Sequence, residues 1–95
     1  LLIEIDNLNF NDATLHVVAG GSRTRLGIVT GKSTAVHTIS WDVPRDLRIE
    51  VDLVGESSFS TNRVDARPGQ SLQLLIEADS RRTRLIHGTR RSGPS

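Results

Sequence analysis

The chain contains no cysteine and no methionine, and only three of its 95 residues are aromatic. Without cysteine it can form no disulfide, no thiolate nucleophile and no cysteine-ligated zinc site. The three rings, Phe10, Trp41 and Phe59, are too few to line a sugar-binding cleft or to stack on single-stranded nucleic acid. No apolar run approaches the roughly 18 residues of a membrane span. We therefore expect neither nucleic acid as a partner nor a bound cofactor.

What remains is a short aliphatic chain with an uneven distribution of charge. With 36% hydrophobic and 24% charged residues, it has the composition of one small folded domain. Residues 1–79 carry seven basic and eleven acidic side chains, a balance of −4. Residues 80–95 carry five arginines and no acid, a balance of +5. We expect a folded domain over residues 1–79, followed by an Arg-rich segment that holds the last strand, a flexible tail, or both.

Alternation of apolar and polar side chains dominates the sequence. In residues 47–53, Leu, Ile, Val and Leu at odd positions alternate with Arg, Glu and Asp at even positions. Such period-two spacing gives an extended strand one dry and one wet face, whereas on a helix the same residues would scatter around the axis. Residues 72–77 repeat the pattern and follow Pro68 and Gly69, which predict a type II turn.

Six further segments alternate less regularly. We expect strands at residues 1–6, 14–19, 25–30, 34–41 and 59–64, and a last one at 83–87. The side chains expected to point inward in the first hairpin are Leu15, Val17, Leu26 and Ile28. Short strands joined by tight turns pair mostly antiparallel, and two layers are needed to bury their apolar faces. The sequence therefore predicts an all-β fold, a small antiparallel immunoglobulin-like β-sandwich of about seven strands, with a partly closed barrel as the alternative.

No set of residues typical of catalysis or of a metal site is present. His16, His37 and His87 are the only imidazoles, and they fall in different predicted strands without the short spacing typical of zinc ligands. No serine occupies a G-x-S-x-G setting, so no nucleophile elbow is predicted. We therefore expect a protein that is not an enzyme.

The Asn- and Asp-rich stretch at residues 6–12 has two interpretations. An EF-hand-type calcium loop is disfavoured, because Leu8 and Phe10 occupy ligand positions when the loop is counted from Asp6. A turn whose side chains bond its own backbone explains the composition better. A carbohydrate- or calcium-binding module that uses this turn is nevertheless the alternative function.

Several apolar side chains fall where alternation predicts a wet face, and Trp41 ends a predicted strand, where its ring either caps the core or projects outward. If they cluster, they form a docking patch with the tryptophan as its anchor. With the arginines of the last segment, the candidate partner contacts are Val18, Trp41, Val54, Leu75, Arg81, Arg82, Arg84, Ile86, Arg90 and Arg91. The expected partners are other protein subunits, and the arginines also suit the anionic headgroups of a membrane surface.

Five short stretches carry a resemblance to a known group of proteins. They are IDN at residues 5–7, ATLHV at 13–17, GG at 20–21, RLGIVTG at 25–31 and ARPGQSL at 66–72. In this order they resemble a family of small exported bacterial proteins, often lipoproteins, with an immunoglobulin-like or transthyretin-like sandwich. The resemblance covers most of residues 3–78 and does not extend to the Arg-rich end. It implies a non-enzymatic accessory subunit, as on the periplasmic face of a bacterial photosynthetic reaction centre–light-harvesting complex, where it would brace neighbouring subunits without binding pigment.

We therefore expect a structural or accessory subunit that stabilises a larger, membrane-associated complex through protein–protein contacts. The expected location is periplasmic or extracellular, with a membrane tether as an option. Because the first residue is Leu1, we expect that an export signal was removed upstream. Provided that the last strand ends early, removal of residues 80–95 is expected to leave the fold largely intact and to weaken attachment to the partner.

Overall fold

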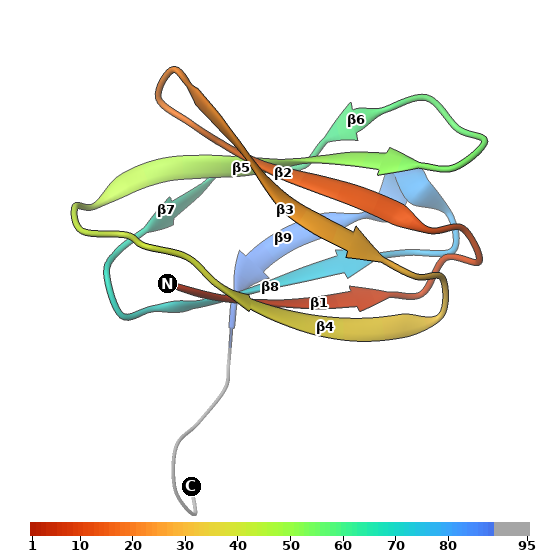
Figure 1. The fold of residues 1–95 in the computed structure, drawn as a ribbon, viewed down its shortest axis with the longest axis horizontal. Coiled ribbons are helices and arrows are strands. Elements are labelled where there is room, and N and C mark those ends of the chain that lie inside the picture. Colours follow the sequence, from red (N-terminus) through yellow and green to blue (C-terminus); the bar gives the residue numbers. More distant parts are fainter. Residues whose placement is uncertain (89–95) are drawn as a thin grey trace, which may run out of the picture.

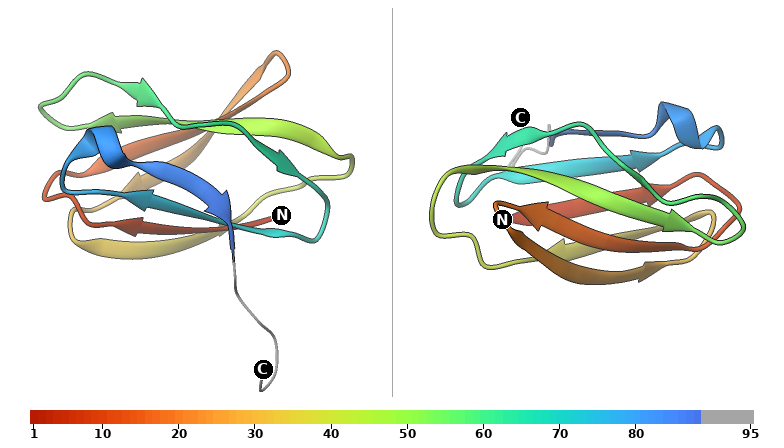
Figure 2. Two further views of the ribbon diagram at one scale, coloured as in Figure 1. Left: turned by 180° about the vertical axis from the view of Figure 1, so that it is seen from behind. Right: turned by 90° about the horizontal axis from the view of Figure 1, so that it is seen from above.

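The computed structural model describes residues 1–88, which fold into two β-sheets packed face to face (Figure 1). The strands are β1 (Leu2–Asn7), β2 (Ala13–Ala19), β3 (Ser22–Val29), β4 (Ser33–Thr38), β5 (Arg45–Leu53), β6 (Phe59–Ser60), β7 (Val64–Ala66), β8 (Ser71–Ile76) and β9 (Arg84–His87). Sheet 1 has the strand order β4-β1-β8-β9, and sheet 2 has the order β3-β2-β5-β6, with β7 also paired to β5. Seen from above, the strand axes of the two layers lie roughly along the same line, whichever way each strand runs (Figure 2). The predicted β-sandwich is confirmed.

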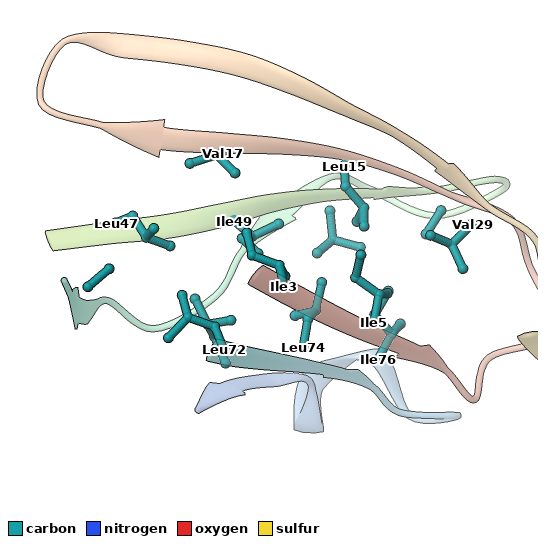
Figure 3. Close-up of a cluster of buried hydrophobic side chains, with 14 of the residues drawn as sticks. Ile3, Ile5, Leu15, Val17, Val29, Leu47, Ile49, Leu72, Leu74 and Ile76 are labelled. Atoms are coloured by element: carbon teal, nitrogen blue, oxygen red, sulfur yellow. The ribbon is translucent and has the colours of Figure 1, made fainter. Parts of the chain in front are cut away.

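Aliphatic side chains from alternate strand positions fill the space between the sheets. The inward residues that alternation predicts in β5 and β8 are all buried: Leu47, Ile49, Val51, Leu53, Leu72, Leu74 and Ile76. Side chains from β1, β2, β5 and β8 point toward one another between the layers (Figure 3). Burial of each such side chain stabilises the fold by roughly 1.5–3 kcal/mol. Because facing layers remove both apolar faces from water, the period-two pattern leads to this architecture.

One strand pair departs from the antiparallel prediction. β1 runs parallel to β8, with Ile3 beside Leu72 and Ile5 beside Leu74, whereas the other ladders are antiparallel. A parallel pair needs a long crossover connection. The chain supplies one because it passes through sheet 2 between β1 and β8.

The prediction for β3 is wrong at Ile28, which is 55% exposed instead of pointing inward. In the ladder with β2, Leu26 is an extra residue without a partner. This β-bulge shifts the alternation along the rest of the strand. Gly27 adopts φ 145° at the bulge, a conformation that glycine reaches without a steric penalty. The inward position therefore falls to Val29, which is 3% exposed, while Leu26 packs partly buried against the core.

Two predicted strands are shorter in the structure than in the sequence-based expectation. The segment 59–64 forms β6 and β7, which pair with successive parts of β5. Thr61 lies between them, and its hydroxyl oxygen accepts a hydrogen bond from the Ile49 N–H at 3.0 Å. A side chain thus replaces a backbone group at this point of the ladder. The segment 34–41 forms a strand only as far as Thr38.

The Arg-rich segment begins inside the folded domain. Residues Ser80–Arg82 form a 3₁₀ helix, and β9 then pairs antiparallel with β8. Leu85 of β9 is fully buried in the core. The sandwich therefore extends past residue 79, and removal of residues 80–95 would take away a core strand, contrary to the expectation that the fold would stay largely intact. Residues 89–95, with Arg90 and Arg91, lie outside the described residues.

The Asn-rich turn between β1 and β2 is held by its own amide side chains. Asn7 is only 1% exposed, and its Nδ2 donates to carbonyl oxygens of Asn11 at 2.9 Å and of the end of β3 at 3.1 and 3.2 Å. The Oδ1 of Asn7 accepts from the Asn9 N–H, and the Oδ1 of Asn9 accepts from the Asn11 N–H. The Nδ2 of Asn9 donates to the carbonyls that follow β8. These amides connect three segments of the chain, so the stretch is the self-bonded turn that the composition favours.

Replacement of Asn7 by alanine is expected to lower the free energy of unfolding by about 2–4 kcal/mol, because several buried backbone groups lose their partner together. Asn11→Ala is the matched control, since its side-chain amide has no hydrogen bond within residues 1–88. Its loss should stay within about 0.5 kcal/mol. Urea unfolding of the two variants measures the difference, and equal losses would contradict the proposed role of Asn7.

Replacement of Leu85 by alanine is expected to cost about 2–4 kcal/mol, because it removes a fully buried side chain and leaves a cavity. Arg84→Ala, one residue earlier on the same strand, removes only an exposed ion pair and should cost less than about 0.5 kcal/mol. Thermal and urea unfolding test this. A Leu85 variant as stable as the parent chain would show that β9 is dispensable.

Candidate protein interaction surface

The predicted contact residues do not form one patch. Leu75 and Ile86 lie on the outer face of sheet 1, on neighbouring strands, and both are half-buried. Leu75 pairs with Arg84 in this ladder, which brings a predicted cation beside them. Val18 lies on the outer face of sheet 2, and Val54, 65% exposed, lies in the turn after β5. The structure therefore gathers three of these residues and separates the other two from them.

Trp41 caps the core and does not project from the surface. Only 9% of the residue is exposed, and its indole Nε1 donates to the Ala66 carbonyl oxygen at 2.9 Å. The guanidinium carbon of Arg45 lies 4.4 Å from the centroid of the indole ring, in a cation–π arrangement. Of the two alternatives for Trp41, the structure has the ring that caps the core, because burial satisfies both the ring and its N–H inside the fold.

The described arginines of the last segment are partly neutralised by nearby acids. Arg81 bonds both carboxyl oxygens of Asp79, at 3.1 and 3.2 Å, and this hydrogen bonding lowers the pKa of the Asp79 carboxyl. Arg84 forms an ion pair with Glu77 at 3.2 Å. Arg82 is exposed and has no ion pair with any described residue. The positive charge that residues 80–88 can offer to a partner is therefore smaller than the sequence suggests.

The outer face of sheet 2 carries charges that satisfy one another. The Nε of Arg23 lies 2.7 Å from Glu50 Oε1, and its Nη2 lies 3.5 Å from His16 Nδ1. Hydrogen bonding from Arg23 lowers the pKa of the Glu50 carboxyl. Outward-facing polar and charged residues are normal for an antiparallel sheet with one solvated face. This face has the ordinary character of a surface in contact with water.

The outer face of sheet 1 is different, because every one of its strands presents an aliphatic side chain. These side chains are Leu2 of β1, Val36 of β4, Leu75 of β8 and Ile86 of β9. We call this set the aliphatic face. It surrounds a polar centre in which Glu4 lies between Val36 and Gln73, and Gln73 Nε2 donates to Asp6 Oδ2 at 2.9 Å. Sequence reasoning did not single out Leu2 and Val36, although both occupy outward positions just as Leu75 does.

Most open edges of the two sheets are protected against pairing with another strand. β3 is bulged and carries the exposed Arg23 and Arg25, while β6 and β7 span only two and three residues. At β9, the side chain of Asn62 takes the place of a partner strand: its Nδ2 donates to the Leu85 carbonyl at 2.8 Å, and its Oδ1 accepts from the Leu85 N–H at 3.0 Å. Bulges, charges, shortness and coverage are the common means of preventing edge association.

β4 has none of these features. Its six residues, STAVHT, include no charge, proline or glycine, and its ladder with β1 is regular. Within residues 1–88, β4 pairs with β1 and with no other strand. Thr34, Val36 and Thr38 are exposed along it. The aliphatic face and the open edge of β4 adjoin, and together they form the candidate interaction surface.

Apart from the candidate interaction surface, residues 1–88 form grooves but no cluster of side chains suited to bind a metal ion. One groove of about 630 Å³ is lined by Glu56, Ser57, Ser58, Phe59, Ser60, Ser80, Arg81 and Thr83. A second groove of about 270 Å³ lies beside Trp41.

Within residues 1–88, no three His, Asp or Glu side chains come together as metal ligands. No helix in this part of the chain is long and apolar enough to cross a membrane.

No protein-family model matches the chain, and a search of curated proteins finds no match either. The interpretation of the surface therefore depends on the geometry of the residues described above.

Replacement of Arg23 by glutamine is expected to raise the pKa of Glu50 toward its ordinary value, because the main cause of its lowering is lost. In the parent chain, the lowered pKa of Glu50 stabilises the fold at pH values above the ordinary carboxyl pKa. This stabilisation is lost as the pH falls through the pKa that Glu50 has in the folded state. The variant should lack this pH dependence. Arg25→Gln, on the same strand, is the control and should leave the Glu50 titration, followed by NMR, unchanged.

Proposed function

We propose that the protein is a non-enzymatic structural or accessory subunit that stabilises a larger complex through protein–protein contacts. The observation that carries the proposal is the aliphatic face, which places an apolar side chain on each strand of an uncovered sheet. Outward positions of a solvated antiparallel sheet are normally polar, as on the central strand β5 of sheet 2, although β2 and β3 of that sheet also present Val18 and Ile28. A partner that covers sheet 1 would remove these side chains from water, with the corresponding hydrophobic gain in free energy.

The mixed composition of this face suits a partner protein. Its apolar side chains surround the polar Glu4, Asp6 and Gln73, and the hydrogen bond between Gln73 and Asp6 orients these two side chains on the face. Arg84 borders the face and is held in place by Glu77. Apolar contacts combined with a limited number of oriented polar groups are typical of specific protein interfaces. Among residues 1–88 the only helix is the short 3₁₀ turn Ser80–Arg82, and no helix lies over the outer face of sheet 1 (Figure 1).

The setting proposed for this role is outside the cytoplasm, in the periplasm or the extracellular space. The resemblance to small exported β-sandwich proteins supports it, and it suggests a photosynthetic reaction centre–light-harvesting complex as the assembly to examine first. The fold is of the kind expected for such a subunit. Arg82, with Arg90 and Arg91 beyond the described residues, would add attraction to an acidic protein surface or to anionic headgroups.

A carbohydrate-binding role is the second candidate, and one observation favours it. The groove of about 630 Å³ collects five hydroxyl side chains next to the ring of Phe59 and the charged Glu56 and Arg81. The Asn-rich turn is a poorer place for a ligand, because the side-chain oxygens of Asn7 and Asn9 already accept backbone N–H groups. Calorimetry with a panel of glycans tests this role, and the absence of heat across the panel would remove it.

The main proposal is tested by isolating the protein gently from its native envelope and identifying what accompanies it. The double variant Leu75→Gln and Ile86→Gln should weaken capture of the partner by about tenfold or more, since it replaces two of the apolar contacts of the aliphatic face by polar amides. Ile28→Gln changes an exposed aliphatic residue on the opposite sheet and should capture the partner normally. If the parent chain brings no other protein with it, or if the double variant behaves as the control does, the proposal is wrong.

A further inference from the structure

We propose that the chain associates with a second copy of itself through β4, which pairs antiparallel with β4 of the partner about a twofold axis at Val36. This inference goes beyond the subunit role above, because it concerns the edge of sheet 1 and needs no other protein.

The direction of the backbone groups on β4 is set by its ladder with β1. Leu1 and Ile39 form a hydrogen-bonded pair. The Leu1 amino group donates to the Ile39 carbonyl oxygen at 3.1 Å, and the Ile39 N–H donates to the Leu1 carbonyl oxygen at 2.9 Å. Hydrogen-bonded pairs alternate with non-bonded pairs in an antiparallel ladder. The pairs that contain Thr38, Val36 and Thr34 are therefore the non-bonded ones. The N–H and C=O groups of these three residues point away from β1 toward the open edge.

The sequence of β4 is complementary to itself in this arrangement. With the axis at Val36, each Val36 faces its copy, and Thr34 of one chain faces Thr38 of the other. Each of these pairs can exchange two backbone hydrogen bonds. β-branched residues and opposed threonines are favourable cross-strand pairs, and no like charges meet. A twofold interface requires this kind of self-complementarity.

The inner side of β4 also fits the pairing. In the same register, the small Ala35 faces His37 of the second copy, so that a large side chain lies opposite a small one. Ala35 packs partly buried against the core. The His37 ring lies next to Gly27 of β3, which has no side chain to compete for that space. Pairing therefore does not force two bulky inward groups together.

The neighbouring strand of sheet 2 leaves the edge accessible. β3 approaches β4 near their shared turn and diverges from it toward the β2–β3 hairpin (Figure 1). The opposite edge of sheet 1 is closed by the Asn62 amide at Leu85. Association through β4 therefore stops at two copies and does not continue into a fibre. It joins two copies of sheet 1 and doubles the aliphatic face on one side of the dimer.

The first test measures the mass of the full chain in solution by sedimentation equilibrium over a range of concentrations. We expect a monomer–dimer equilibrium that Val36→Lys shifts to monomer, because two ammonium groups would meet at the axis. Ile28→Lys is the matched control, since Ile28 and Val36 are both 55% exposed and only Val36 lies on β4. A parent chain that stays monomeric at millimolar concentration, or a dimer that Val36→Lys leaves intact, would overturn the proposal.

The second test fixes the register and does not depend on the stability of the lysine variant. The chain has no cysteine, so each introduced thiol is unique. Val36→Cys should form a disulfide-linked dimer on mild oxidation, since Cα atoms of a hydrogen-bonded pair lie about 5.5 Å apart, within disulfide range. Thr34→Cys and Thr38→Cys should cross-link when mixed and not singly. Cross-linking of Ile28→Cys to the same extent as Val36→Cys, or failure of the mixed pair, contradicts the register.

Discussion

The burial of two aliphatic sheet faces against each other is the constraint on which the rest of this structure depends. Because the side-chain period of a strand is two, each strand that contributes to the core must also present a second set of residues to the outside. The core contains Leu, Ile and Val with little aromatic area, so its stability is the sum of many modest contributions. In a domain of this size no layer can be lost without cost. This explains why β9, which lies in the Arg-rich part of the chain, still places Leu85 in the core.

A sandwich of this size has open sheet edges that can pair with strands of other molecules. Some of these edges are protected against such pairing, and one is not. The bulge in β3, the shortness of β6 and β7, and the Asn62 side chain at β9 are unrelated local features with the same consequence. Each removes a regular row of unpaired backbone groups. β4 keeps such a row, and its lack of charge adds to the contrast. This contrast between the edges and the contrast between the two outer faces both distinguish sheet 1 as the side of the molecule suited to contact with other proteins.

The two outer faces differ although they arise from the same alternation. On sheet 2 the outward positions hold ion pairs such as Arg23 with Glu50, together with the aliphatic Val18 and Ile28. On sheet 1 they hold Leu2, Val36, Leu75 and Ile86, one on each strand, among a larger number of polar side chains. The fold tolerates either choice, because outward positions contribute little to the core. A surface that stability does not require is where selection for contact with other molecules can act, and sheet 1 supplies such a surface with an open edge beside it.

The amino-acid sequence alone determined the all-β class, the two layers and the inward residues of β5 and β8, because strict alternation has only one physical interpretation. It also indicated the self-bonded turn around Asn7 and the outward position of Leu75. Only the tertiary structure decided the parallel pairing of β1 with β8, the bulge that exposes Ile28, the burial of Trp41, and the grouping of Leu75 with Ile86 while Val18 and Val54 lie elsewhere. These features depend on which strands become neighbours, and that choice arises from contacts between residues far apart in the chain. Periodicity says which way a side chain points from its strand, but not which strand lies beside it.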